Sequence, residues 1–257
     1  MDTFYFGNTD QRLFGVYHPP SAATWRDTGV VLCYPFSNEY MSTHRIFVRL
    51  AELLNNAGFP VLRFDYFGFG DSEGDTHQPD LDMWRANITQ AMAEVKTRAS
   101  VNKVSLVGLR LGASIAATLP KGRQRPASLV LWDPIVNGET YLRQLDARYA
   151  ARIALPANAP THAKAMAGYL VNSNFIEQIK PLDLTRHDRY PARQLLLVSS
   201  QDKDELTQLR THLETLSVRL THHCTHEAFG WEGQDGHMIW PTQVLKSIVT
   251  FIAKEHP

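Results

Sequence analysis

Cysteine, net charge and long hydrophobic runs are what this sequence has little of. Its 257 residues include only two cysteines, Cys33 and Cys224, which cannot form a disulfide framework and indicate a reducing, cytoplasmic compartment. The 26 basic residues are balanced by 26 acidic residues, without the basic excess of a nucleic-acid-binding protein. No apolar stretch approaches the length of a membrane span, and the N-terminus lacks the basic and apolar regions of a signal peptide. We therefore expect a soluble protein with neither nucleic acid nor membrane as partner.

Short apolar runs alternate with longer stretches of helical period, a pattern typical of a mostly parallel sheet covered on both faces. We predict an N-terminal hairpin, six further strands and the helices between them, which gives an eight-stranded sheet of the α/β class. The predicted strands are 3–7, 13–18, 29–34, 59–65, 103–107, 128–132, 194–199 and 218–222, and the predicted helices are 41–56, 81–98, 113–119, 204–216 and 242–253.

Residues 137–190 interrupt this alternation. They are helical in composition but weakly periodic, and Pro156 and Pro160 break them. We interpret them as a cap inserted over the carboxyl edge of the sheet within one domain, 1–257. Its larger side chains predict an amphipathic pocket without specifying the substrate: Tyr141, Tyr149, His162, Met166 and Tyr169.

The strongest local signal is an apolar strand that leads into Gly108-Leu109-Arg110-Leu111-Gly112 and then into an alanine-rich helix. In a nucleophile elbow the middle residue adopts a strained backbone conformation, and the glycines avoid collisions with the neighbouring strand and helix. Here the middle residue is Arg110. A guanidinium stays protonated and only donates hydrogen bonds, so it cannot act as the nucleophile.

Two further residues follow the elbow in the order expected for such a site, first an acid and then a histidine. The acid is Asp202, with Asp204 as the near alternative, and the histidine is His237, just before the last predicted helix. A histidine oriented by Asp202 can act as a general base. The alternative is an exposed loop histidine in a chain that has 11 histidines.

The loop after the strand 29–34 is the expected oxyanion region. Backbone amides near Phe36, together with that of Leu111, can face a developing oxyanion. Glu39 in the same region can pair with Arg110 or Arg45, or can remain a solvated loop carboxylate. If Glu39 pairs with Arg110, the arginine can be structural and fill the space of a lost nucleophile.

Other candidate nucleophiles and ligands are weaker. Ser37, Ser72 and Ser114 lie off the strained turn, and Cys33 falls within a predicted buried strand. Residues 222–226 contain three histidines and a cysteine, but neighbours on a strand point to opposite faces, so we predict no metal site and no cofactor.

The chain resembles the serine aminopeptidase-like branch of the α/β-hydrolase superfamily, especially the exosortase-associated hydrolases found near biosynthetic gene clusters. The resemblance spans nearly the whole chain and is carried by residues 17–20, 34–39, 63–75 and 108–113. It implies the α/β-hydrolase fold, a cap, and a site at Arg110, Asp202 and His237. Members of this subgroup look similar even at the arginine, so serine acylation cannot be transferred to this chain, because fold alone does not fix function.

Three functional hypotheses follow. The first is an enzyme of small-molecule biosynthesis in which His237 and Asp202 move a proton while Arg110 binds an oxygen of an anionic, acyl or thioester-linked substrate, for hydrolysis or a lyase or isomerase step. The second is a non-catalytic protein that binds ligand or serves as a scaffold. The third and weakest is an esterase or thioesterase with a displaced serine. The sequence does not indicate an oligomeric state.

Overall fold

The computed structural model describes residues 1–20, 25–120, 124–149, 160–201, 203–225, 227 and 240–257. Its centre is an eight-stranded sheet with the strand order β1-β2-β4-β3-β5-β6-β9-β10. All pairs are parallel except β1 with β2 and β2 with β4, so the predicted mostly parallel sheet is confirmed. The strands are β1 (Asp2–Asn8), β2 (Gln11–His18), β3 (Thr28–Cys33), β4 (Val61–Phe64), β5 (Lys103–Leu109), β6 (Ser128–Trp132), β9 (Gln194–Ser199) and β10 (Arg219–Cys224).

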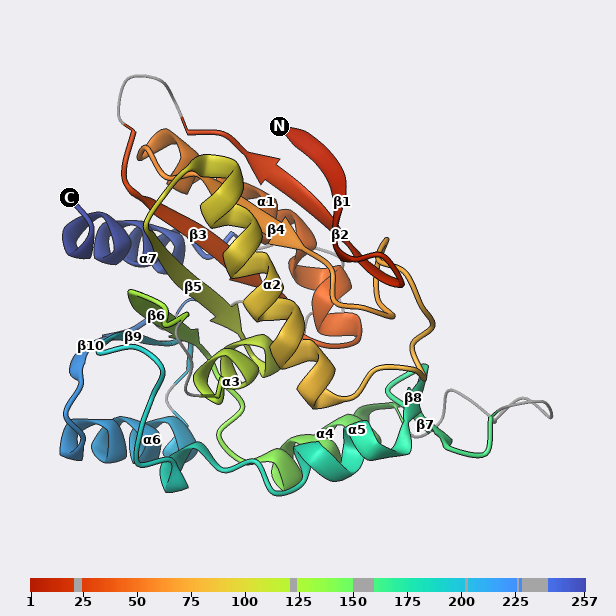
Figure 1. The fold of residues 1–257 in the computed structure, drawn as a ribbon. Coiled ribbons are helices and arrows are strands. Elements are labelled where there is room, and N and C mark those ends of the chain that lie inside the picture. The colour runs from red at the N-terminus through yellow and green to blue at the C-terminus, as the bar shows by residue number, and fades with distance from the viewer. Residues whose placement is uncertain (21–24, 121–123, 150–159, 202, 226, 228–239) are drawn as a thin grey trace.

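Helices cover both faces of this sheet, as Figure 1 shows. Helices α1 (Asn38–Asn56) and α7 (Thr242–Glu255) pack together on one face, whereas α2 (Leu81–Ala99) and α3 (Leu111–Ala117) pack together on the other. Helix α6 (Asp204–Thr215) lies beside the edge formed by β9 and β10. The central strands β3, β5 and β6 are almost wholly buried, as expected for parallel strands with helices on both sides.

Asp80 and Gly58 mark helix ends, as their chemistry predicts. The Asp80 side chain caps α2 by accepting a hydrogen bond from the Met83 backbone N–H at 2.8 Å. Gly58 lies just past the end of α1 with φ at 92°, a conformation that favours glycine. The helix predicted over 41–56 therefore ends where α1 ends, although α1 begins three residues earlier, at Asn38.

The segment between β6 and β9 contains more than the helices expected from its composition. It comprises α4 (Gly138–Tyr149), a hairpin of β7 (Ala163–Met166) and β8 (Tyr169–Asn172), α5 (Ser173–Ile179) and the short 3-10 helix η1 (Leu184–Arg186). The hairpin was not predicted. Its four-residue strands are too short for an alternating pattern to stand out, and its turn uses Ala167 and Gly168, both with positive φ.

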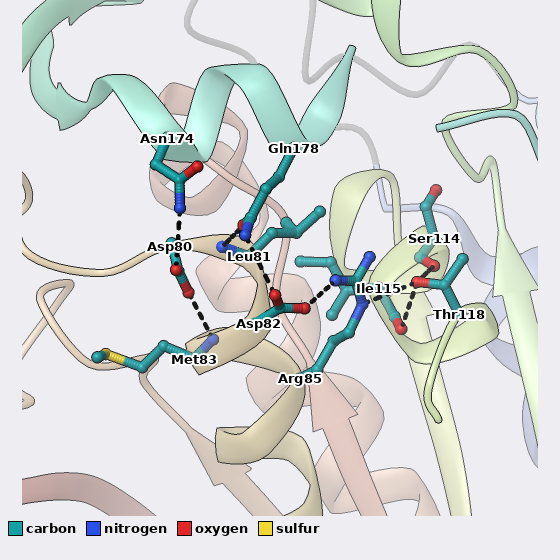
Figure 2. Close-up of polar contacts among 10 residues, drawn as sticks. All are labelled: Asp80, Leu81, Asp82, Met83, Arg85, Ser114, Ile115, Thr118, Asn174 and Gln178. Carbon is teal, nitrogen blue, oxygen red and sulfur yellow. Dashed lines mark hydrogen bonds and ion pairs between the residues drawn. The ribbon is translucent and has the colours of Figure 1, made fainter. Parts of the chain in front are cut away.

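Helix α5 is fixed to the N-terminus of α2 by side-chain amides, as Figure 2 shows. Gln178 accepts a hydrogen bond from the Leu81 N–H at 2.7 Å and donates to Asp82 at 3.2 Å, while Asn174 donates to Asp80 at 3.2 Å. The N–H groups of a first helical turn have no partner within the helix, so Gln178 satisfies one that would otherwise need water.

The same contacts continue to the helix that follows the elbow. Arg85 bonds to Asp82 at 2.6 Å and to the Thr118 hydroxyl at 3.3 Å, and Thr118 donates to the carbonyl of Ser114 (Figure 2). A continuous series of polar contacts therefore joins α5, α2 and α3.

Within the described part of the chain, no helix combines the length and hydrophobicity needed to span a membrane.

Two buried histidines make the stability of the fold depend on pH. His18 accepts a hydrogen bond from Arg63 Nε at 3.1 Å, and burial together with the Arg63 charge lowers its pKa to about 4. His256 lies 3.0 Å from the Ser128 hydroxyl, and burial lowers its pKa to about 4 as well. Both groups are neutral in the folded chain near pH 6 and take up a proton on unfolding, since an unfolded histidine has a pKa of about 6.5.

We therefore expect the free energy of unfolding to be constant with respect to these groups above about pH 6.5 and to fall as the pH drops from 6.5 towards 4. With two protons taken up, the slope approaches about 2.7 kcal/mol per pH unit. Urea denaturation between pH 4.5 and 8 measures it. His256→Gln removes one titrating group and should make the slope shallower, whereas equal stability at pH 7 and pH 5 would contradict the prediction.

Candidate functional site

The turn predicted to be an elbow lies between a strand and a helix as expected, and its backbone is strained. Arg110 lies between β5 and α3 with φ at 53° and ψ at −123°, an uncommon conformation for a residue with a side chain. Its backbone N–H donates to the Trp132 carbonyl at 3.0 Å, which holds the turn against the end of β6. The strained conformation thus falls on the residue where the sequence predicts the middle of a nucleophile elbow, and a guanidinium there cannot serve as a nucleophile.

The two glycines of the elbow are required by close backbone contacts. A Cβ on Gly108 would lie 2.4 Å from the Ala113 Cα, and a Cβ on Gly112 would lie 2.2 Å from the Tyr34 carbonyl oxygen. Neither backbone contact can be relieved by rotation of a flexible side chain. The spacing of these glycines therefore reflects the fold, whatever residue stands between them.

The Arg110 guanidinium forms an ion pair with Glu39 at the start of α1. Its Nε lies 3.0 Å from Glu39 Oε1, and the side chains of arginine and glutamate are only 12% and 6% exposed. The Tyr141 hydroxyl of α4 lies 3.4 Å from the other Glu39 oxygen, and the Arg110 Cζ lies 5.7 Å from the Tyr141 ring centroid. Of the two partners considered for Glu39, the structure selects Arg110.

The pair keeps the arginine charged despite its burial. Burial alone would lower the pKa of Arg110, but the charge and hydrogen bond of Glu39, together with Tyr141 and Asp133, outweigh burial and hold that pKa above the ordinary value. In a buried site the two opposite charges stabilise each other, whereas either charge without its partner would destabilise the fold.

The region predicted to bind an oxyanion presents backbone rather than the Phe36 side chain. The Phe36 ring is fully buried among aromatic rings, including that of Tyr169 at 6.1 Å, so only its backbone can face a substrate. The next residue, Ser37, has φ at 65° and donates from its hydroxyl to the Ala167 carbonyl in the β7–β8 turn at 3.2 Å. Leu111 is buried as the first residue of α3, where helical N–H groups have no intrahelical partner. The hairpin thus contacts the predicted oxyanion loop directly.

Asp133 is a site residue that the sequence analysis did not single out. It follows β6 with φ at 39°, is only 4% exposed, and accepts a hydrogen bond from the Ser200 N–H at 2.9 Å on Oδ1. Among the described residues its other oxygen, Oδ2, is buried without a hydrogen-bond partner. Burial raises the pKa of Asp133, although the Ser200 hydrogen bonds and the Arg110 charge act in the opposite direction.

Arg110 and Asp133 line a common small cavity of about 30 Å³, together with Tyr141, Lys203 and Glu205. This volume is enough for about one or two water molecules but not for an acyl chain. The Arg110 Nη1 also approaches the Asp133 carbonyl at 3.4 Å. The elbow, the end of β6, α4 and the start of α6 therefore enclose one polar space.

The serines considered as displaced nucleophiles donate their hydroxyl groups to backbone carbonyls. The Ser114 hydroxyl donates to the Ile135 carbonyl at 2.8 Å, and Ser72 donates to the Asp65 carbonyl at 2.6 Å. Ser114 and Ser37 are also buried. Cys33 is buried in β3, where desolvation raises the pKa of its thiol to about 12. These contacts weigh against a displaced serine or cysteine as nucleophile.

The predicted acid Asp202 and the predicted histidine His237 lie outside the described residues. The alternative acid, Asp204, is the first residue of α6 and is exposed. Of the acidic residues that the structure describes in this region, Asp133 and Glu205 line the cavity and Asp204 does not.

The residues expected to line a cap pocket have separate environments. Tyr141 contacts Glu39, Met166 is buried, and the Tyr169 ring packs on the core beside Phe36. His162 is exposed and its ring centroid lies 5.7 Å from that of His77, and the side chain of Tyr149 is outside the described set.

The sequence contains one signal that would have found Asp133. This residue directly follows a buried strand, and such residues gather at the carboxyl edge of a parallel sheet.

Comparison with known proteins gives a family and several proteins of similar fold. The family described as serine aminopeptidase, S33, matches residues 37–229. The lysophosphatidylserine lipase ABHD12 of Xenopus tropicalis is 26% identical over 155 residues, and that of Danio rerio is 24% identical over 153 residues. Each alignment covers 52% of this chain but only 39% of the relative, so the chain matches about two fifths of those proteins.

Solved structures share the fold at low sequence identity. Est1E from Butyrivibrio proteoclasticus, solved with ferulic acid bound, is 16% identical with a TM-score of 0.67 and 98% of each chain covered. A putative hydrolase from Agrobacterium vitis is 16% identical with a TM-score of 0.62, covering 100% of this chain and 99% of that one. The fold is that of the α/β hydrolases, and the family match extends over most of the sequence. This chain therefore belongs to the serine aminopeptidase, S33, family.

Proposed function

We propose that this chain is a hydrolase-type enzyme of small-molecule metabolism that acts on an acyl or thioester-linked substrate without a serine nucleophile. The observation that carries the proposal is the Arg110–Glu39 pair, which holds a permanent positive charge on the strained elbow beside a polar cavity. A fixed charge at that place stabilises negative charge that develops on a reacting oxygen.

In the proposed mechanism, His237, oriented by Asp202, takes a proton from water as the water oxygen attacks the substrate carbonyl. Negative charge develops on the carbonyl oxygen, near Arg110 and the backbone N–H groups of Leu111 and the residues around Phe36. When the intermediate collapses, the imidazolium returns the proton to the leaving group, so one water is consumed and one acid and one alcohol or thiol are released. The same groups also suit proton abstraction in a lyase or isomerase step.

The Glu39 charge narrows the substrate class. Because the negative charge of Glu39 offsets the positive charge of Arg110, the pair attracts a full anion less strongly than an unpaired arginine would. This favours a substrate whose reacting group is neutral and becomes negative only in the transition state.

A second candidate is a ligand-binding protein without turnover, and one observation favours it. Arg110 is held by Glu39, Tyr141 and the Asp133 carbonyl, as expected of a side chain that fills the place of a lost nucleophile. This reading requires no proton transfer by His237, which allows the two candidates to be separated.

Replacement of His237 by alanine should lower kcat by roughly 10²–10⁴-fold on a panel of acyl esters and thioesters, because proton transfer is lost. The double variant Arg110→Ala, Glu39→Gln should mainly lower kcat, because the Arg110 charge acts only when negative charge develops in the transition state. His187→Ala, a half-buried histidine in the loop after η1, is the matched control and should keep parental kinetics. Ligand binding without turnover in the parent chain, unchanged by His237→Ala, would instead support the second candidate.

A further inference from the structure

A second hollow lies away from the elbow, between α1 and α7. Its volume is about 340 Å³, and its walls include Leu53 of α1, Leu245 and Val249 of α7, and Trp240 just before α7. Leu245 is buried to 3% exposure, whereas Trp240 remains 46% exposed, which is high for so large an apolar side chain. The two helices pack together on one face of the sheet (Figure 1), so this groove is part of the rigid scaffold.

Among the residues that the structure describes, the charged ones that line the groove are both cations, Arg49 and Lys246. Arg49 pairs with Glu52 at 2.9 Å, but each side chain is 48% exposed, and an ion pair so open to water contributes little stability. Within the described part of the chain, Lys246 has no ion pair. The groove therefore combines apolar walls with a positive rim.

Its size favours a small ligand over a protein partner. Pockets for small molecules start at about 300 Å³, whereas a stable dimer buries about 800 Å² on each partner. The exposed positions of α7 are all polar, both those that line the groove and those beside it: Thr242, Gln243, Lys246, Thr250 and Lys254. Such a surface does not resemble the apolar centre of an obligate interface.

We propose that this groove binds an anionic amphiphile, with its aliphatic chain along Leu53, Leu245 and Val249 and its carboxylate between Arg49 and Lys246. The Trp240 ring would cover the chain from the open side. The proposal is independent of the chemistry at Arg110, because none of the groove residues lines the elbow cavity.

Isothermal titration calorimetry with four probes tests this assignment: octanoate, butyrate, octanol and octyltrimethylammonium. Each probe is used at a concentration at which it is monomeric in solution. We expect saturable binding of octanoate, weaker binding of octanol, and none of butyrate or the cation. Lys246→Glu should weaken octanoate roughly tenfold and leave octanol unchanged. Lys254→Glu, the same change near the end of α7, is the control and should leave both affinities unaltered.

Val249→Arg should abolish binding of both octanoate and octanol by filling the groove. If that variant does not fold, brominated octanoate replaces it as the test. It should quench the tryptophan fluorescence of Trp240→Phe less than that of Trp25→Phe, since Trp25 is the other exposed tryptophan among the described residues. Absence of saturable octanoate binding, or binding that Lys246→Glu leaves unchanged, would overturn the proposal. A dimer in the parent chain that Val249→Arg dissociates would also overturn it and assign the groove to a second copy.

Discussion

The double variant Arg110→Ser, Glu39→Gln should react covalently with a fluorophosphonate probe, whereas the parent chain should not. Residue 110 already has φ at 53° and ψ at −123°, so a serine there would be presented by the turn without any rearrangement of the backbone. Leu111 at the start of α3 supplies an N–H for the phosphonyl oxygen. The remaining requirement is a histidine within reach to take the serine proton.

The second substitution is needed because Arg110→Ser alone would leave the Glu39 carboxylate buried without its partner. Glutamine keeps the size of the side chain and an acceptor for the Tyr141 hydroxyl. Mass spectrometry should find one adduct per chain, located on residue 110. The variant Arg110→Ala, Glu39→Gln is the matched control and should remain unlabelled.

Adding His237→Ala to the labelled variant should abolish the reaction, because serine without a general base is weakly nucleophilic. If the folded double variant fails to react at all, His237 does not reach residue 110, and the proposed proton transfer is wrong. If the parent chain itself is labelled, a displaced serine is the nucleophile, contrary to the contacts of Ser37, Ser72 and Ser114.

The fold was predictable because its signals are local and physical. Buried parallel strands give continuous apolar runs such as 128–132, Gly58 ends α1, and Asp80 caps α2, each through the chemistry of one or two residues. The β7–β8 hairpin was not predicted from the sequence because strands of four residues show no clear period, and because its turn has the uncommon sequence Ala167-Gly168.

The sequence predicted only the part of the candidate site that depends on backbone geometry. The glycines at 108 and 112 indicated the elbow because any Cβ there would collide with backbone. The partner of Glu39 was open between two arginines, since pairing depends on how α1 lies against the elbow, 71 residues further along the chain. The place of Asp133 directly after a buried strand was visible in the sequence, but its burial and the lack of a donor to Oδ2 among the described residues are not revealed by sequence spacing.

Removing either charge of the Arg110–Glu39 pair alone should destabilise the fold strongly. We expect Glu39→Gln and Arg110→Met each to lower the free energy of unfolding by about 3–5 kcal/mol, because each leaves one uncompensated charge in a buried site. The double variant should lie within about 1 kcal/mol of the parent, since neither charge then remains. Urea denaturation of the four proteins gives the coupling energy directly.

The exposed pair Lys180–Glu177 provides the comparison, with a shorter distance of 2.7 Å but side chains 50% and 52% exposed. The same cycle there should give less than about 1 kcal/mol, because water screens both charges. A small coupling energy at Arg110–Glu39 would mean that the pair does not hold this part of the fold together. The stable double variant then separates the two roles of the arginine. If turnover survives in it, Arg110 serves the fold alone, and if turnover is lost while stability is kept, the positive charge is required by the reaction itself.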